Sequence, residues 1–502
     1  MKESLDVISK QQKELSTFSG IGALLGWDQM TYMPKAGAAE RSEQSALLSQ
    51  LAHERVVDDA FWHHIQLLMR EDTFSKLKHR DQIIVKRLHT DVEKARKIPS
   101  DFVVRMAKTT TLAYQAWEEA RAKQQFTVFA PHLEKIIALE KEYAGYISLP
   151  GHPYNSLLDD YEEGMTVDIL KREFSYLKRE LATLLNKITE SEKFATQKGL
   201  SLSLSSKKQE ELCRTMMNTM LLPKEKTRLD MSTHPFTTSM ANDDVRITTN
   251  FGRQQPLFAF FSTIHEAGHA LYELGMPQDE YKDTVISDSP SLGMHESQSR
   301  FWENMIARSK PFWSYCYPLF KKTFSSAFKT IDFDTWYSYV NQVKPSLIRV
   351  EADELTYGLH VILRFELELA LIDGSLSVTE LPSAWNKKMH EYLRIEPTND
   401  VDGVLQDMHW SGGSFGYFPT YLIGTVYASQ LFDTLSLDNP VVKDDISQGN
   451  FTSILQWLRK HVHSYGRRLT AEEIMQKTCG EGLNSSTFVT YLKNKYSLLY
   501  GL

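Results

Sequence analysis

The chain is poor in cysteine, lacks an excess of basic residues and has no long apolar run. Only Cys213, Cys316 and Cys479 occur among 502 residues, and an odd number so widely spaced is not a disulfide framework. The 57 basic residues against 64 acidic ones give a net charge of −7, so the positive excess that attracts nucleic acid is missing. No stretch reaches about 18 uncharged apolar residues, and residues 1–18 lack the apolar core of a secretory signal. We therefore expect a cytoplasmic protein with no nucleic-acid partner and no membrane span.

Helical periodicity dominates what the sequence does contain. Apolar residues recur at helical spacing through most of the chain, for example in residues 51–71 and 102–122, which predicts a mainly α fold. Breaks such as YMPKAG and LPGHPYN carry Gly and Pro, but none is long enough to be an interdomain linker. One domain over residues 1–502, at most divided into two helical lobes around a groove, is the simplest organisation. The clearest strand candidate is DVRITTN, residues 244–250, where β-branched residues alternate with polar ones.

The segment FAFFSTIHEAGHALYEL, residues 258–274, has the apolar spacing of a helix and contains an H-E-x-x-H pattern. His265 and His269 should lie one turn apart on the same helix face, where two imidazoles can bind one metal ion. Glu266 points to a neighbouring face, from which its carboxylate can act on a water without being a ligand. Two unrelated helix histidines would show the same spacing, and the pattern arises by chance in roughly a few per cent of chains of this size.

A catalytic zinc ion takes three protein ligands and keeps one position for water, so a third residue must be found. Glu273 continues the same face, but it lies about 12 Å along the helix axis from His265, too far to share an ion. A longer zinc motif would place Gly and His where this chain has Tyr272 and Gly275, and it is excluded.

A second helix can supply the missing ligand. Residues 289–309 have helical apolar spacing, and Ser289 and Pro290 are good residues to start a helix. Glu296, Glu303 and His295 are all available on it, and the spacing alone does not choose among them.

HEAGH at 265–269 followed by HESQSR at 295–300 resembles the thermostable carboxypeptidase 1 (Taq-type) family of zinc metallocarboxypeptidases. Further segments resemble family motifs in the same order: WDQMTYMP at 27–34, HPFTT at 234–238, DVRIT at 244–248, IRVEAD at 348–353 and GVLQDMHW at 403–410. The resemblance implies that Glu296 is the third zinc ligand. It also implies a saddle-shaped, helical, usually dimeric enzyme with a long groove. Such enzymes remove single residues from peptide C-termini with broad specificity and a poor response to C-terminal proline.

A carboxypeptidase must bind the free carboxylate of its substrate, and a guanidinium can bind both oxygens. Arg349, in SLIRVEADE, and Arg246, in DVRIT, are the candidates. Arg349 could instead form a salt bridge with Asp353, and Arg246 could be an ordinary arginine on a strand surface.

The expected reaction uses zinc to lower the pKa of a water toward about 7 while Glu266 accepts the proton and later passes it to the leaving amine. Donors to the oxyanion are expected in residues 406–424, where glycines permit a tight loop. Related helical zinc peptidases use a His and a Tyr there, which favours His409 with either Tyr417 or Tyr421. Asp407 could orient a histidine or cap a helix. Cobalt or manganese could replace zinc.

Two other functions fit the same motif. A zinc oligopeptidase or dipeptidase would share the metal chemistry without needing a free C-terminus. A non-catalytic helical scaffold could bind peptides in its groove, although it would have no need of Glu266. The remaining histidine pairs, at 63–64 and at 461 and 463, are expected to pack or lie at the surface, and the aromatic run at 312–320 to belong to the core or a dimer interface.

Overall fold

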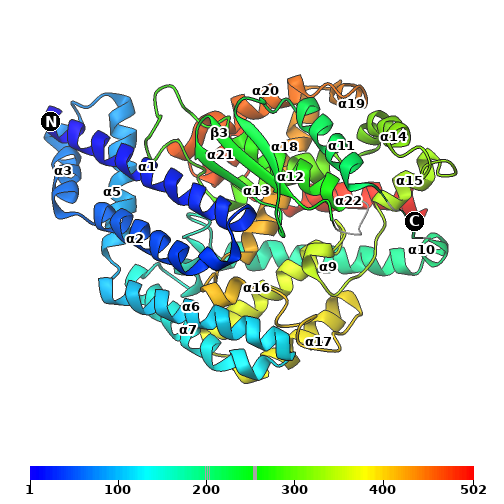
Figure 1. Cartoon of the computed structure of the whole chain (residues 1–502), viewed down its shortest axis with the longest axis horizontal. Coiled ribbons are helices and arrows are strands. Elements are labelled where there is room, and N and C mark those ends of the chain that lie inside the picture. Colours follow the sequence, from blue (N-terminus) through cyan, green and yellow to red (C-terminus); the bar gives the residue numbers. More distant parts are fainter. Residues whose placement is uncertain (198, 201, 203, 253–256) are drawn as a thin grey trace.

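The computed structural model is mainly helical and describes residues 1–197, 199–200, 202, 204–252 and 257–502 (Figure 1). The helices before the sheet are α1 (Lys2–Thr31), α2 (Ala38–Val56), α3 (Asp59–Met69), α4 (Glu71–Phe74), α5 (His79–Arg96), α6 (Ser100–Lys123), α7 (Phe126–Ile147), α8 (Tyr154–Leu158), α9 (Val167–Thr189), α10 (Glu192–Thr196) and α11 (Ser206–Thr219). The expectation of a mainly α fold is confirmed.

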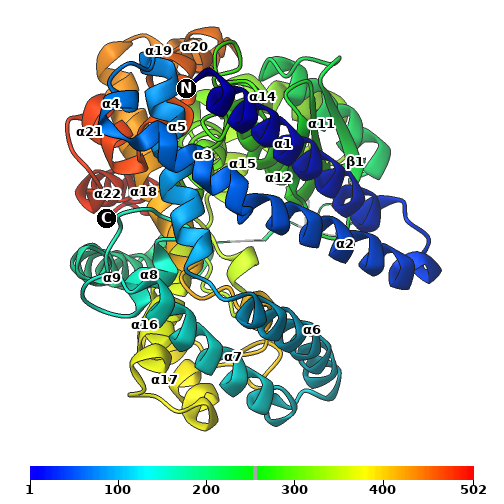
Figure 2. The same ribbon diagram turned by 90° about the vertical axis from the view of Figure 1, so that its left-hand side faces the viewer.

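The helices after the sheet carry most of the motifs. They are α12 (Phe258–Glu273), α13 (Leu292–Arg300), α14 (Lys310–Thr323), α15 (Phe333–Val340), α16 (Tyr357–Asp373), α17 (Leu381–Leu393), α18 (Phe418–Asp438), α19 (Val442–Ser447), α20 (Thr452–His461), α21 (Ala471–Cys479) and α22 (Ser485–Tyr500). Figure 2 shows α6, α7, α16 and α17 gathered below, with α1, α2 and the sheet above. Within the described ranges, no helix combines the length and the apolar character needed to cross a membrane.

A small sheet packs beside α12. Its order is β1 (Thr227–Met231), β3 (Asp244–Thr249) and β2 (Thr237–Ala241), with β1 parallel and β2 antiparallel to β3. Ile247 lies opposite Leu229 on one side and Thr237 on the other. Val245 and Ile247 are fully buried while Arg246 between them is only half-buried, as alternation along a strand requires. The strand predicted at 244–250 is confirmed, and it is the central strand of the sheet.

Within the part of the chain that the structure describes, the buried apolar side chains form two separate clusters. The larger one runs through α7, α9, α12–α18 and α20–α22 and includes Phe312, Trp313, Cys316 and Phe320, so the aromatic run at 312–320 is mainly core. The smaller one joins α1, α3 and α5 through residues such as Ile8. The helices that carry the H-E-x-x-H and HES motifs therefore lie in the larger core, while α5 belongs to the smaller one.

Candidate active site

Helix α12 places both histidines of the H-E-x-x-H pattern on one face. Its apolar residues Phe260, Phe261, Ile264 and Leu271 are buried, which turns the histidine face toward α13. The rings of His265 and His269 lie 4.9 Å apart, one helical turn from each other.

Helix α13 begins two residues later than the sequence suggests. The expectation that Ser289 and Pro290 start the helix is wrong, because Ser291 is the N-cap residue and its hydroxyl accepts a hydrogen bond from the Met294 amide at 2.9 Å. The helix continues into a π-helical segment, Phe301–Ile306. This segment carries Glu303, so that Glu296 and Glu303 both face α12.

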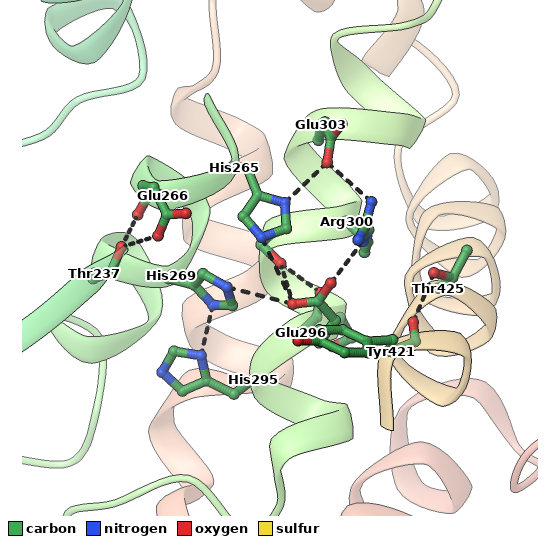
Figure 3. A network of polar contacts seen from close by, with 12 residues as sticks. Thr237, His265, Glu266, His269, His295, Glu296, Arg300, Glu303, Tyr421 and Thr425 are labelled. Carbon is green, nitrogen blue, oxygen red and sulfur yellow. Dashed lines mark hydrogen bonds and ion pairs between the residues drawn. The ribbon is translucent and has the colours of Figure 1, made fainter. Parts of the chain in front are cut away.

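The side chains of His265, His269 and Glu296 converge in space (Figure 3). The Oε2 atom of Glu296 lies 3.7 Å from Nε2 of His265 and 3.5 Å from Nε2 of His269. Ligand atoms about 2.0–2.2 Å from a tetrahedral ion lie roughly 3.4 Å from one another. The three side chains therefore fit a single divalent ion, and two nitrogens with one carboxylate oxygen are a donor set that zinc prefers.

Three glycines allow close packing around this cluster. A Cβ atom at Gly268 of α12 would lie 2.7 Å from the carbonyl oxygen of Gln298 in α13. A Cβ atom at Gly424 of α18 would lie 2.7 Å from Cβ of Glu296, and one at Gly293 would lie 2.3 Å from the carboxylate of Glu162. A side chain at Gly268 would force α12 away from α13, one at Gly424 would force α18 away from α13, and one at Gly293 would displace the Glu162 carboxylate that accepts from its amide. The separation between the histidines and Glu296 thus depends on glycine.

Arg300 holds the Glu296 carboxylate in its charged form. Its Nε atom donates to Oε1 of Glu296 at 2.7 Å, while the Ser299 hydroxyl donates to Oε2 at 3.2 Å. Although burial opposes the negative charge, Arg300 and His265 lower the pKa of Glu296 well below its ordinary range. Glu296 is therefore an anion with one oxygen fixed by Arg300 and the other facing the histidines.

Glu303 contacts the outer nitrogen of His265 instead of joining the ligand cluster. Its Oε2 atom lies 2.9 Å from Nδ1 of His265, and Arg300 and Arg308 donate to its carboxylate as well. Burial opposes the charge, but Arg300 and His265 lower the pKa of Glu303 to about 2. A carboxylate at Nδ1 fixes the tautomer that leaves Nε2 of His265 free to bind a metal ion.

His295 and Glu273 form a corresponding arrangement behind His269. Nδ1 of His295 lies 2.6 Å from Nδ1 of His269, and Nε2 of His295 lies 2.8 Å from Oε1 of Glu273. Of the three candidates on the second helix, Glu296 thus faces both Nε2 atoms, while Glu303 and His295 contact the outer nitrogens. Glu273 is too distant from His265 to share an ion with it. It contacts His295, and His295 in turn orients His269.

Glu266 is buried beside the cluster and hydrogen-bonded to the sheet. The Thr237 hydroxyl of β2 lies 2.6 Å from Oε2 of Glu266 and 2.9 Å from its backbone carbonyl oxygen. Burial is the main cause that raises the pKa of Glu266. Sequence reasoning missed Thr237, although it lies within the HPFTT motif and its strand position opposite Ile247 directs it toward α12.

The Gly-rich segment brings His409, Tyr417 and Tyr421 together. Nε2 of His409 lies 3.2 Å from the Tyr421 hydroxyl, and the His409 ring centre is 5.2 Å from that of Tyr417. Burial lowers the pKa of His409 to about 4, so the ring is neutral at neutral pH. Tyr421 lies beside Glu296 in Figure 3, which places this group next to the metal-ligand cluster.

Arg349 is buried and forms an ion pair with Asp407, a partner that its spacing in the sequence did not suggest. Its Nε and NH2 atoms donate to Oδ1 of Asp407 at 3.1 and 2.8 Å, and NH1 donates to the Tyr357 hydroxyl at 3.2 Å. The expected alternative partner, Asp353, instead accepts from the amides of Lys344, Leu355 and Thr356. Among the residues that the structure describes, the Asp407 oxygens accept from Arg349 and Arg364, and no hydrogen bond joins them to a histidine or to a helix N-terminus. The guanidinium of Arg349 lies 4.9 Å from the Tyr421 ring centre.

Arg246 lies on the sheet face that points away from α12. It pairs with Thr238, next to Thr237 on β2, so the two side chains leave the sheet on the face opposite Thr237. There its guanidinium binds Asp244 at 2.7 and 2.8 Å and stacks 4.3 Å above the Trp27 ring of α1. The structure therefore places Arg349 next to the candidate oxyanion donors and Arg246 between the sheet and α1.

A charged cavity of about 570 Å³ opens beside His295. Its walls include Glu273 and Ser291 on the side of the metal-ligand cluster, and Arg87, Asp91 and Lys94 of α5 on the other side. A cavity of this size is large enough for several residues of an extended peptide.

The remaining histidine pairs lie outside the ligand cluster. His64 contacts the Ser4 hydroxyl at 3.2 Å, and His461 stacks on Trp457 with ring centres 4.8 Å apart. His463 is buried, and its Nε2 atom lies 3.0 Å from Oε1 of Gln298 in α13. It therefore supports the helix that carries Glu296.

Known proteins resemble this chain over its whole length. Carboxypeptidase 1 of Bacillus subtilis (strain 168) is 38% identical over 503 residues, covering 99% of this chain and 98% of that protein. Thermostable carboxypeptidase 1 of Pyrococcus furiosus is also 38% identical, with 98% of each chain covered. The crystal structure of the M32 carboxypeptidase from Deinococcus radiodurans R1 matches with a TM-score of 0.96 at 34% identity, covering 100% of both chains.

The fold and the site together define a helical metallopeptidase, an enzyme that hydrolyses peptide bonds. The family model described as Carboxypeptidase Taq (M32) metallopeptidase matches residues 7–496. The chain belongs to this family of metallocarboxypeptidases, as the resemblance of its motifs indicates. Its substrates are peptides, and its candidate metal site fits a divalent ion.

Proposed function

We propose that the protein is a zinc-dependent carboxypeptidase that releases single residues from peptides with a free C-terminus. The observation that carries the proposal is the convergence of His265, His269 and Glu296, with the Glu266 carboxylate held beside them by Thr237. A zinc ion bound there would polarise the scissile carbonyl and activate a water.

Glu266 accepts and returns the proton in this proposal. Its carboxylate is buried and fixed by one hydroxyl, and its raised pKa makes it a stronger base than an exposed glutamate. It takes a proton from the attacking water and delivers it to the departing amine. Because Thr237 binds one oxygen, the other is free for this transfer.

His409, Tyr417 and Tyr421 are proposed to stabilise the oxyanion. If Nε2 of neutral His409 donates to the Tyr421 oxygen, the Tyr421 hydroxyl hydrogen is free to point at the substrate. Tyr417 lies 5.3 Å from Tyr421 between ring centres and can donate from the same side. Replacing each tyrosine by phenylalanine separately, and comparing kcat at saturating substrate, assigns the donor.

Arg349 is proposed as the main receptor for the terminal carboxylate, with Arg246 as the second candidate. NH1 of Arg349 donates to a tyrosine hydroxyl, and a substrate carboxylate would be a stronger acceptor at that nitrogen. Asp244 engages Nε and NH2 of Arg246, as Asp407 does for Arg349, but the Arg246 guanidinium stacks on Trp27 of α1 and does not lie beside the candidate oxyanion donors. Arg349→Lys should therefore raise KM for free peptides more than Arg246→Lys does.

The test is mass spectrometry of one peptide and its C-terminally amidated twin, incubated with the protein with and without a chelator. Loss of single residues from the free peptide alone, stopped by chelator and restored by zinc, supports the proposal. Internal cleavage of both peptides would indicate an oligopeptidase. No cleavage even with zinc, cobalt or manganese would indicate a peptide-binding scaffold.

The resemblance to the family supports three further proposals. The enzyme accepts many C-terminal residues but acts poorly on C-terminal proline, which a peptide series differing only in the last residue tests. It forms a homodimer, which sedimentation equilibrium tests. It works in the cytoplasm, in keeping with Cys213, Cys316 and Cys479, which are all free thiols.

A further inference from the structure

A second cavity, of about 490 Å³, lies between α6, α7 and the turn that follows His409. It shares Asp160 and Tyr161 with the cavity beside His295, so the two hollows adjoin. The Tyr161 ring lies 5.3 Å from that of Tyr417, one of the candidate oxyanion donors. A peptide whose scissile bond lies at the metal-ligand cluster can therefore extend into this second cavity.

Glu140 of α7 faces this cavity with no partner for its charge. Its side chain is buried, with 5% of the residue exposed, and within the described ranges it makes no hydrogen bond or ion pair. Its Oε1 atom lies 2.9 Å from the position of a Cβ atom at Gly413, so only the absence of a side chain in the turn leaves room beside it. Burial, together with the charges of Asp160 and Glu368, raises the pKa of Glu140 well above its ordinary value.

The walls around Glu140 suit an apolar stem that ends in a cation. They include six apolar side chains, Ile98, Phe102, Val103, Met106, Leu157 and Phe415. Neither lysine nor arginine lines the cavity among the residues that the structure describes, and its other titratable groups are His53, Tyr143, Asp160 and Tyr161. Tyr143 donates to Asp160 at 2.8 Å, and Lys94 binds the same carboxylate, so Asp160 is already paired. Glu140 is the acidic group left to receive a cation.

We propose that this cavity is a subsite for a cationic group of the peptide substrate, bound by the Glu140 carboxylate. The proposal rests on the peptidase function proposed above and adds a preference to it. A lysine or arginine side chain would lay its methylene stem along the apolar walls and place its charge at Glu140. The N-terminal ammonium of a short peptide carries the same charge and could reach the same carboxylate.

The proposal is tested with peptides in which lysine replaces norleucine at each position in turn upstream of the last residue. Norleucine has a similar stem without the charge. We expect the wild type to prefer lysine at one position by about tenfold in kcat/KM, the effect of one hydrogen-bonded ion pair. Glu140→Gln should abolish this preference. Glu134→Gln is the matched control, because Glu134 is exposed on the same helix, and it should retain the preference.

Two additional experiments distinguish a side-chain cation from the N-terminal ammonium and control for misfolding. Each peptide is also made with an acetylated N-terminus, and loss of the preference on acetylation would identify the terminal ammonium as the ligand. Ala107→Lys, at an exposed position on the cavity wall, supplies a competing cation while Glu140 stays intact, and it should also abolish the preference. Activity on the norleucine peptides shows that each variant is folded.

The outcomes distinguish the subsite from the enzymatic function. If the wild type releases residues from lysine and norleucine peptides equally at every position, the subsite is refuted and the peptidase stands. The same holds if Glu140→Gln keeps the lysine preference, whatever the result for Ala107→Lys. If the wild type releases no residue from any peptide, the peptidase function fails and the subsite with it.

Discussion

Replacing Glu303 by glutamine should weaken zinc binding although Glu303 is not in the ligand cluster. The carboxylate of Glu303 accepts from Nδ1 of His265 at 2.9 Å, and glutamine keeps the shape and an acceptor oxygen but loses the charge. With the charge gone, Nε2 of His265 becomes a weaker donor of electrons to the ion. Arg300 then no longer shares its charge with a second carboxylate on this segment, and it draws Glu296 more strongly toward itself.

The size of the effect follows from the geometry. Hydrogen bonds to charged groups contribute about 1.5–3 kcal/mol, and roughly half of this remains with a neutral acceptor. Because about 1.4 kcal/mol is a factor of ten in affinity, the dissociation constant for zinc should rise about tenfold. Removing the residue that binds the outer nitrogen of a histidine ligand commonly lowers metal affinity by about 10–100-fold, and the expected tenfold loss lies at the lower end of this range.

The assay is competition for zinc between the metal-free protein and a chromogenic chelator at neutral pH. Glu391→Gln, an exposed position on α17, is the control and should leave the affinity unchanged. At saturating zinc, Glu303→Gln should recover most of its turnover, because the three ligands and Glu266 remain. His265→Ala, assayed in the same way, should bind zinc poorly. If Glu303→Gln nevertheless binds zinc as tightly as the wild type, the reasoning is refuted.

Three further predictions follow from other contacts. Gly424→Ala should lower the free energy of unfolding by about 1–3 kcal/mol in urea titrations, since its Cβ would lie 2.7 Å from Cβ of Glu296. Gly145→Ala is the control: a Cβ there meets nothing within 4 Å, so the free energy of unfolding should not fall. Glu266→Gln should abolish turnover while zinc remains bound at one ion per chain, measured by atomic absorption; an active variant would contradict its role as the base. Burial raises the pKa of Glu368 from an ordinary 4.5 to about 7, so its contribution to stability is present below pH 4.5 and is lost as the pH rises through 7. Unfolding free energies measured between these values should fall with pH by up to about 3 kcal/mol more in the wild type than in Glu368→Gln, and equal slopes would contradict the raised pKa.

The local elements of the site were predictable because their signals lie within single segments. The spacing of apolar residues predicts α12 within one residue of its bounds, and alternation predicts β3. The facing of His265 and His269 follows from helix geometry alone. The strand and the helix could be placed without knowing what they pack against.

Contacts between segments were not predictable from spacing. The choice among Glu296, Glu303 and His295 depends on how closely α13 approaches α12, and that approach depends on Gly268, whose role no local pattern reveals. Asp407 is the partner of Arg349 because two distant segments meet, whereas spacing favoured the nearby Asp353. In both cases tertiary packing decided between partners that were equally suitable in the sequence.

The separate core of α1, α3 and α5 has a consequence for how the molecule opens. Proteins unfold locally in units, and a unit with a small apolar core opens at a lower free energy than the main body. Arg87, Asp91 and Lys94 of α5 form one wall of the cavity beside His295, while the metal-ligand helices belong to the larger core. In hydrogen exchange, the amides of α3 and α5 should therefore exchange before those of α12 and α13. One wall of the substrate cavity can thus loosen while the ligands keep their positions.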